Sequence, residues 1–338
     1  MSLVRGIFVL LSFLLAIHTV NAQRDTADIK SYADQVMIRA NLDTNIESYI
    51  FKEGEPGNEK QQIFSINNKT KVSFSIDYRI ISATLSFAPK FFSDNKDNDL
   101  KGNSSYTDFS VRFFPKRLIQ SLYYKNVKGF YIENMKDNFP DWKEGDPYLQ
   151  FPNLRVQSFG GSTAYILNED FSARSIYTQG EWQKKSSGSW VPFLDYDLTI
   201  FRDKVAEQNL KETQYKIGAN MGYFYNWIWG KNVSISPYLA FGLGGKFSTY
   251  KDVRGDGTIK NAQYMTLRME GGLNMGYNTD RFLFGGRMNF SAYTYNQARD
   301  QAVQSNSVYG LLYIGYRFAP PRVVEDTYHK IQKKIPVL

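Results

Sequence analysis

The sequence predicts an all-β protein, a transmembrane antiparallel up-and-down β-barrel of about 12 strands in the cell outer membrane. Three observations support this prediction. The C-terminal part of the chain repeats a two-faced strand pattern, and the N-terminus has the form of an export signal. The rest of the sequence contains no apolar run approaching the ~20 residues that a membrane-spanning helix needs.

The alternation is clearest between Tyr264 and Phe318, where the pattern occurs three times. Successive side chains of a β-strand point to opposite faces, so residues two apart share a face. In the last copy, Tyr309, Tyr313 and Arg317 fall on one face. The other face carries Val308, Gly310, Leu312, Ile314, Tyr316 and Phe318. Such a strand is typical of a barrel wall that contacts lipid outside and a polar interior.

The first residues predict a signal peptide. Arg5 precedes the apolar run from Gly6 to Ile17, and small side chains at Val20-Asn21-Ala22 form the expected cleavage site. The chain contains no cysteine, which excludes disulfides and a lipid anchor attached through sulfur. We therefore expect a signal peptide at 1–22, a periplasmic lead segment at 23–33, the barrel at 34–318 and a periplasmic C-terminal tail at 319–338.

The composition fits a barrel. Lys and Arg outnumber Asp and Glu by 41 to 33, but the cations are scattered among carboxylates. This favours solvated turns and an ion-paired lumen over a nucleic-acid surface. Aromatic residues make up 16% of the chain, as expected for the girdles at both membrane interfaces, although a soluble β-sandwich would also place such residues in its core.

The strand pattern is clean near the C-terminus and blurs toward the N-terminus. The predicted strands are 34–43, a pair across 71–90, two within 105–134, then 154–167, 171–180, 189–201, 215–228, 233–246, 262–277, 282–296 and 305–318. Short turns at Gly230-Lys231-Asn232 and Asn278-Thr279-Asp280 alternate with longer connections at 202–214, 247–261 and 297–304. Because periplasmic turns are short and external loops long, we expect the C-terminus in the periplasm.

Other segments are predicted as irregular. Residues 135–152 have the length of an external loop, yet the strand count places them in the periplasm, so one strand nearby is miscounted. Residues around Gly54-Glu55-Pro56-Gly57 are predicted as a loop. Ala319-Pro320-Pro321 ends the last strand, and the tail is expected to be solvated or weakly helical, with a periplasmic docking role as the alternative.

Several segments resemble a known family. They are Asn168-Glu169-Asp170-Phe171-Ser172, Gln179, Gln183 to Ser189, Asp34 to Arg39 and the hairpin from Lys71 to Lys90. Over most of the mature chain, the sequence resembles a Bacteroidetes outer-membrane β-barrel family catalogued as domain of unknown function 4421. The resemblance implies a fold and a compartment and transfers no catalytic residues. Ala173 and Ser187 depart from the family pattern.

The histidine content argues against an enzyme. The chain has two histidines, His18 in the predicted signal peptide and His329 in the tail. Outer-membrane phospholipases, acyltransferases and proteases resemble one another in using a histidine to activate serine or water. We expect no enzyme activity, because His329 would reach a barrel site only if the tail folded back.

The inward faces of the strands are predicted to carry a charged cluster. If Trp190 and Leu194 face lipid, the two nearby aspartates face the lumen, roughly 7 Å apart. The cluster consists of Asp195, Asp197, Arg268, Glu270, Arg287 and Arg317. Structural ion pairing is favoured, because acid–base cleavage of a glycoside requires one protonated carboxyl and the arginines keep both ionised. Anion selection in a pore is the alternative.

Other motifs are weak. Gly242-Leu243-Gly244-Gly245 lies on a predicted strand with no helix after it, which favours close strand packing over phosphate binding. Arg254-Gly255-Asp256 matches an adhesion tripeptide by chance, and with Asp252 it lacks the ligand spacing of a calcium loop. We expect no cofactor and no metal.

Three functions remain open. They are a structural or partner-binding barrel with an ion-paired lumen, a narrow solute pore with anion selectivity, and a hydrolase of lipid or glycan, which the histidine content disfavours. The expected partners are outer-membrane lipid, the barrel assembly machinery and, for a pore, a small solute. Nucleic acid is not an expected partner.

Overall fold

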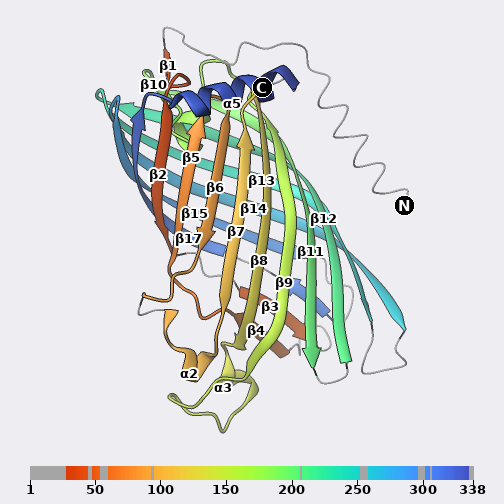
Figure 1. Cartoon of the computed structure of the whole chain (residues 1–338). Helices are drawn as coiled ribbons and strands as arrows, with labels where there is room; N and C mark the ends of the chain where they lie inside the picture. The colour runs from red at the N-terminus through yellow and green to blue at the C-terminus, as the bar shows by residue number, and fades with distance from the viewer. Residues whose placement is uncertain are drawn as a thin grey trace.

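The computed structural model describes residues 28–44, 48–53, 60–92, 95–205, 208–251, 258–295, 301–304 and 307–334. Within these residues, 12 antiparallel strands form a closed barrel, as predicted (Figure 1). The wall strands are β2 (Val36–Asp43), β5 (Lys71–Tyr78), β6 (Ile81–Phe87), β7 (Ser105–Phe113), β8 (Leu118–Ile132), β9 (Gln150–Tyr165), β11 (Ser187–Val205), β12 (Gln208–Trp229), β13 (Val233–Lys251), β14 (Ile259–Asn278), β15 (Phe282–Tyr295) and β17 (Ser307–Phe318). Each strand pairs with the wall strands next to it in sequence, and β17 pairs with β2 to close the ring.

The two faces of the wall differ as the alternation predicts. Along β17, Val308, Leu312 and Ile314 are exposed, whereas Tyr313 and Arg317 are buried. The same rule holds around the barrel, because large apolar side chains are exposed outside and Ser, Asn, Asp, Lys and Arg side chains are buried inside. A water-soluble protein seldom exposes so much contiguous apolar surface, and a lipid-facing barrel does. The protein is therefore an outer-membrane β-barrel.

Among the described residues, no helix has the length and apolar character that a membrane crossing requires.

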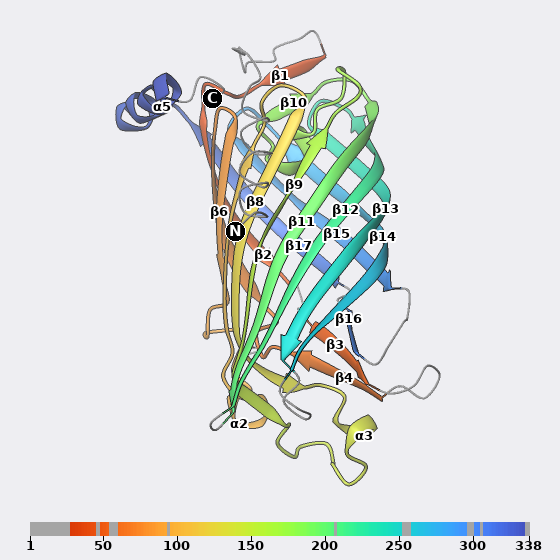
Figure 2. The ribbon, with the colours of Figure 1, turned by 90° about the vertical axis from the view of Figure 1, so that its right-hand side faces the viewer.

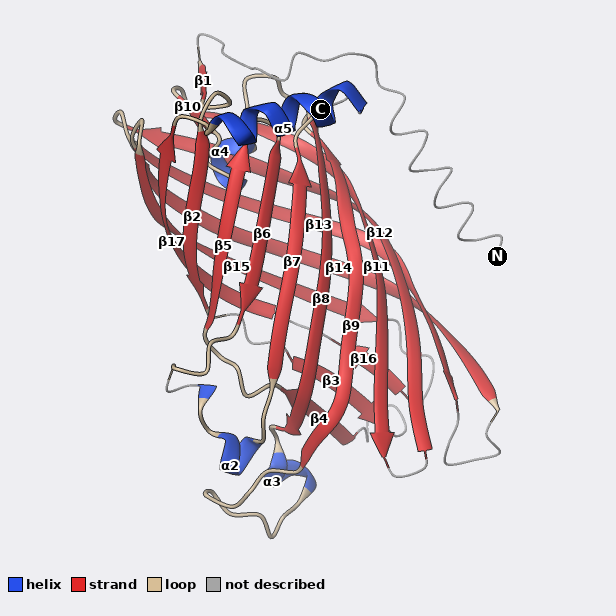
Figure 3. Ribbon diagram, viewed as in Figure 1, coloured by secondary structure: helices blue, strands red, loops and turns tan. Residues whose placement is uncertain are grey.

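The two ends of the barrel have different connections. One end carries short turns at 79–80, 114–117, 230–232 and 279–281, and the C-terminal helix α5 (Arg322–Lys334) follows there. We call it the C-terminal end and expect it to face the periplasm. The opposite end, here the loop end, carries the helices α2 (Asn98–Lys101) and α3 (Met135–Asn138) in its connections (Figure 3).

Residues 133–149 lie at the loop end, which resolves the conflict over segment 135–152. The miscounted strand is 171–180. That prediction is wrong, because the segment contains a short helix, α4 (Arg174–Tyr177), and does not join the wall.

Two of the loop-end connections are shorter than predicted, whereas the one predicted at 297–304 runs from β15 to β17 and contains a short strand, β16 (Gln301–Gln304). The expected loop at 202–214 is wrong, since β11 continues to Val205 and β12 begins at Gln208. Likewise, β13 reaches Lys251 and β14 begins at Ile259. The pairs Lys204↔Asn209 and Lys251↔Ile259 show why, since backbone pairing extends these hairpins through polar sequence. The motif Arg254-Gly255-Asp256 and its neighbour Asp252 lie outside the described residues.

A β-hairpin at the loop end replaces part of the loop predicted after residue 43. It consists of β3 (Ser48–Glu53) and β4 (Lys60–Ser65), and β3 also pairs with β16 (Gln301–Gln304). Residues 54–57, predicted as a loop, lie outside the described residues.

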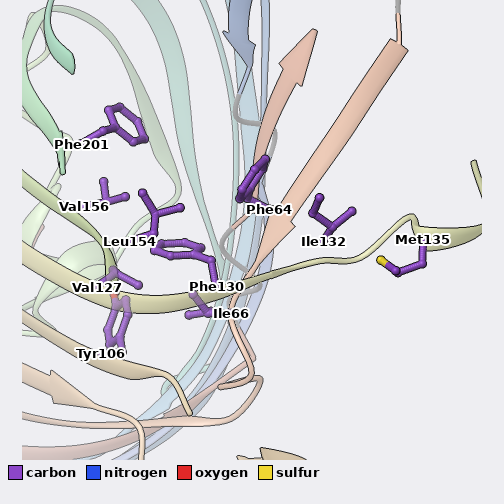
Figure 4. Packing of buried hydrophobic residues seen from close by; sticks show 10 residues of the cluster. All are labelled: Phe64, Ile66, Tyr106, Val127, Phe130, Ile132, Met135, Leu154, Val156 and Phe201. Atoms are coloured by element: carbon purple, nitrogen blue, oxygen red, sulfur yellow. The ribbon is translucent and has the colours of Figure 1, made fainter. Parts of the chain in front are cut away.

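The hairpin packs on the lumen side of the wall. Tyr49 and Phe51 contact Phe201 edge-on, at ring-centroid distances of 5.3 and 6.1 Å. Phe201 and Val156 occupy inward-facing positions, and Phe130 is buried in the same apolar cluster (Figure 4). An apolar cluster therefore stands on the lumen side at the loop end, where alternation alone predicts polar side chains.

Candidate functional site

The connection between β9 and β11, residues 166–186, folds inward at the C-terminal end, and we call it the plug. It holds α4 and a short strand, β10 (Glu181–Gln183). Its side chains are buried almost without interruption from Phe171 to Gln183. α4 lies behind the front strands of the wall in Figure 3, near the end where α5 lies. The plug explains why this end carries one long connection among short turns.

Three arginines of the wall bind backbone carbonyl groups at the end of α4. The guanidinium of Arg287 donates to Ile176 O at 2.5 Å, and that of Arg39 donates to Tyr177 O at 3.2 Å. Helix C-termini leave carbonyls without intrahelical partners, and cations are favoured beside them. The wall therefore satisfies the orphan acceptors of a helix too short to be stable alone.

Arg317 is the most buried of the three wall arginines, at 1% exposure. It donates to Gln179 O at 2.5 Å, Asn278 Oδ1 at 2.8 Å and Thr279 O at 2.7 Å. Its guanidinium also lies 3.9 Å from the centre of the Tyr32 ring. One side chain thus joins the plug, a wall turn and the N-terminal segment.

Polar side chains hold the rest of the plug. Asn226 of β12 donates to Ser172 O at 3.0 Å, Ser175 Oγ at 2.8 Å and Gln183 Oε1 at 2.6 Å. Within the plug, Arg174 and Glu181 form a buried ion pair at 3.3 Å. Buried polar groups are stable only when they are hydrogen-bonded, so this set of partners specifies one plug conformation.

The first described strand, β1 (Ile29–Ser31), holds the plug in position. It pairs with β10, and Lys30 forms an ion pair with Asp280 at 2.5 Å. The hydrogen bond from Lys30 lowers the pKa of the Asp280 carboxyl, and it raises the pKa of Lys30 in turn. Asp280 is exposed and Lys30 is partly exposed, so the pair positions β1 more than it stabilises the fold.

An ion network lies on the lumen side of the wall. Arg268 donates to Asp195 Oδ1 at 2.8 Å and also contacts Glu270. Asp195 accepts a second hydrogen bond from Asn220. Gly242 stands between Asn220 and Arg268 in the register, and a Cβ there would lie 1.8 Å from Asn220 Oδ1. The glycine therefore serves close packing, as predicted for this motif.

Asp197 lies two residues after Asp195 on β11 and faces the lumen on the same side of the strand. It accepts hydrogen bonds from Tyr123 and from Thr199, the latter at 2.6 Å, and Lys216 lies 3.8 Å away. Its partners are thus mostly neutral hydroxyls.

The six residues predicted as one cluster divide into two groups. Asp195, Asp197, Arg268 and Glu270 line one cavity, whereas Arg287 and Arg317 bind the plug. Arg39, Arg174 and Asn226 were not predicted as site residues. The alternation in residues 34–43 places Arg39 inward and was the available signal for it, but no sequence pattern places a plug beneath it.

Among the cavities of the described part of the barrel, two meet beside the plug. One, of about 300 Å³, is lined by the ion network, by Tyr123 and Lys216, and by Phe171 and Tyr177 of the plug. The other, of about 350 Å³, is lined by hydroxyl-bearing side chains, by the cations of Arg39, Arg112, Lys125 and Arg287, and by the carboxylates of Asp43 and Asp108. Arg112 lies over the ring of Tyr177, 4.7 Å from its centre, where the two cavities meet. Within the described ranges, no three His, Asp or Glu side chains gather as metal ligands.

Comparison with solved structures shows low similarity to bacterial outer-membrane barrels. The translocator domain of autotransporter NalP from Neisseria meningitidis is 11% identical, with 84% of this chain and 88% of that chain covered and a TM-score of 0.40. An outer membrane channel from Pseudomonas putida F1 is 11% identical, with 88% and 100% covered and a TM-score of 0.39. The outer membrane protease OmpT from Escherichia coli is 10% identical, with 88% and 100% covered and a TM-score of 0.34.

At these values the similarities to solved structures carry no argument about function. A search of curated proteins finds no match. The family model described as "Domain of unknown function (DUF4421)" matches residues 23–318. The Bacteroidetes origin attached to the resemblance stays a prediction. Because the match spans most of the sequence, the chain belongs to the DUF4421 family, as its resemblance predicted.

Proposed function

We propose that the protein is a plugged outer-membrane barrel with a structural or partner-binding role, which does not conduct in its resting state. The observation that carries this proposal is the plug, whose backbone carbonyls are bound by Arg39, Arg287 and Arg317 from three wall strands. Hydrogen bonds to charged donors are each worth about 1.5–3 kcal/mol, so spontaneous release of the plug is costly.

The loop end supports the same proposal. The β3–β4 hairpin packs aromatic side chains against the inner face of the wall, and each buried aromatic contributes about 1.5–3 kcal/mol. A barrel of about 12 strands lies between the filled eight-stranded barrels and the water-filled porins, so its conductance depends on such internal segments. Outer-membrane lipid and the barrel assembly machinery are the partners we propose for the wall itself.

Planar-bilayer recording tests the proposal. The wild type should be silent at all voltages, and the double variant R39A/R287A should show intermittent current because the α4 carbonyls lose two donors. K185A is the control, since this change leaves both arginines in place. Heat-modifiable gel mobility must show that each variant is a folded barrel. Steady current through the wild type would overturn the proposal.

A narrow anion-selective pore is the second candidate. It is supported by the two polar cavities and by Arg112 and Arg287, whose guanidinium groups donate to the neutral acceptors Ser121 Oγ and Ile176 O. Cations paired only with neutral groups favour anions in a pore. In liposome swelling assays, this candidate requires anionic solutes to enter faster than cations of equal size, and R112A to remove the difference.

A lipid or glycan hydrolase is the third candidate. Asp195 and Asp197 are engaged by Arg268, Asn220, Thr199 and other wall side chains, which favours a structural role. Purified protein incubated with phospholipid and glycan should show no turnover. Turnover abolished by D195N would establish the hydrolase instead.

A further inference from the structure

α5 packs on the outside of the barrel. Its Tyr328 is buried against Val36 and Tyr78, which occupy lipid-facing positions of β2 and β5. Val36 and Tyr78 are 1% and 8% exposed, whereas Ile38 and Ile76, two residues further along the same faces, are 46% and 47% exposed. The helix therefore covers the last layer of the lipid-facing surface at the C-terminal end. Figures 1 and 2 agree that it lies outside the wall.

Side chains of the wall fix this position. The rings of Tyr78 and Tyr328 meet edge-on at 5.4 Å, and the guanidinium of Arg79 lies 4.8 Å from the centre of the Tyr328 ring. Val324 and Phe318 pack against the same cluster. The helix is thus held on the wall and is not a free tail.

A second apolar stripe of α5 lies beside the side that contacts the wall. Val323, Thr327 and Ile331 are spaced four residues apart, so they share one side of the helix. Val323 is 75% exposed and Ile331 is 39% exposed. This stripe is next to the wall-contacting stripe of Val324 and Tyr328 and therefore adjoins the lipid-facing surface that the helix covers.

The remaining side of α5 is charged. Arg322, Lys330 and Lys333 are exposed there, together with Asp326 and His329. A helix with an apolar side and a cationic side lies in the plane of a membrane surface, with its apolar side chains at the acyl boundary and its cations near the phosphates.

We propose that α5 is an interfacial helix that binds the phospholipid surface of the leaflet at the C-terminal end. It inserts Val323 and Ile331 at the acyl boundary and places Arg322, Lys330 and Lys333 near headgroup phosphates. The continuity of the apolar stripe with the lipid-facing wall identifies the occupant as lipid. This role concerns the outer rim and is independent of the plug.

Site-specific fluorescence tests the proposal, and the absence of native cysteine makes single labelling clean. An environment-sensitive fluorophore is attached to V323C or I331C in the full chain, reconstituted in vesicles of phosphatidylethanolamine and phosphatidylglycerol. D326C and H329C, on the charged side, are the matched controls. Nitroxide-labelled phospholipid should quench positions 323 and 331 several-fold more than the controls, and iodide should quench the controls several-fold more.

Two outcomes would overturn the proposal. Equal iodide quenching at all four positions would mean that α5 lies in water. Blue-shifted emission at 323 and 331 without quenching by nitroxide lipid would mean that protein covers the stripe, as for a second copy or a soluble partner. The variant K330E/K333E should reduce the nitroxide quenching at 323, and unchanged quenching would remove the phosphate contact from the proposal.

Discussion

Replacing Arg317 should release the plug while leaving the barrel closed. The guanidinium supplies hydrogen bonds to Gln179, Asn278 and Thr279 and stacks on Tyr32. In R317A, three buried acceptors lose a charged donor and the ring loses its cation. Summing about 1.5–3 kcal/mol per bond would overcount, since the bonds share one side chain and water replaces some of them. Each buried acceptor left without a partner costs about 1–3 kcal/mol, so we expect a total of about 4 kcal/mol for the set.

A change of about 4 kcal/mol raises the equilibrium ratio of open to closed plug roughly 10³-fold, because each 1.4 kcal/mol is a factor of ten. Hydrogen exchange measured by mass spectrometry in lipid nanodiscs reports this ratio, since protected amides exchange through local opening. Amides of residues 171–183 should exchange roughly 10³-fold faster in R317A. R317K should lie between the two, because an ammonium group cannot reproduce the planar fork or the stacking.

The control is R281A, which removes an exposed arginine from the adjacent turn and should leave exchange in the plug unchanged. Unchanged plug exchange in R317A would refute the reasoning. So would equal acceleration throughout the wall, because the arginine would then stabilise the whole barrel and not the plug.

Three further predictions concern other parts of the molecule. G242A should displace Asn220 from the ion network and lower the urea concentration at the unfolding midpoint. An alanine substitution at a lipid-facing position should not displace Asn220. F130A should cost about 3–5 kcal/mol of unfolding free energy and increase proteolysis of the β3–β4 hairpin. The pKa of Asp280 is lower in the folded protein than in the unfolded chain, where it is about 3.9. The ion pair with Lys30 therefore stabilises the fold at pH values above the unfolded-state pKa, and this stabilisation is lost as the pH falls through the folded-state pKa. NMR signals of β1 amides should broaden in that acidic range, and D280N should show the weaker attachment at neutral pH.

The wall could be predicted from the sequence because lipid imposes a rule on every strand. A side chain facing hydrocarbon must be apolar, so alternation marks β17, β15 and β14 residue by residue. The inward direction of Arg268 and Arg317 follows from the same rule. Strand ends were less predictable, since the polar residues around Val205 and Gln208 pair as strands beyond the apolar belt.

The plug could not be predicted in the same way. A segment inside a polar lumen contacts wall side chains on all sides, so it needs neither alternation nor a helical period. Residues 171–180 were therefore read as a wall strand, although their partners are the wall side chains Arg287, Arg317 and Asn226. Part of the family resemblance falls on the plug and the start of β11, at Asn168 to Ser172, Gln179 and Gln183 to Ser189. The resemblance identified these residues as part of the family pattern, but it did not predict that they fold as a plug inside the barrel.

The plug and α5 both contact β2 and β17, the two strands whose pairing closes the barrel. β17 pairs with β2 over Leu311–Phe318, which is nearly as short as the pairs β5–β6 and β6–β7 and much shorter than the pair of β13 and β14 over Val233–Lys251. On the lumen side of this short seam, Arg39 of β2 and Arg317 of β17 both donate to the plug.

On the lipid side of the seam, α5 packs across Val36 of β2 and Phe318 of β17. The first and last strands are thus joined by a third element on each face, in addition to their own hydrogen bonds. Since Arg317 is available only when the last strand is in place, the plug can acquire its full set of contacts only after the ring closes. Closure of the ring therefore positions two of the arginines that hold the plug.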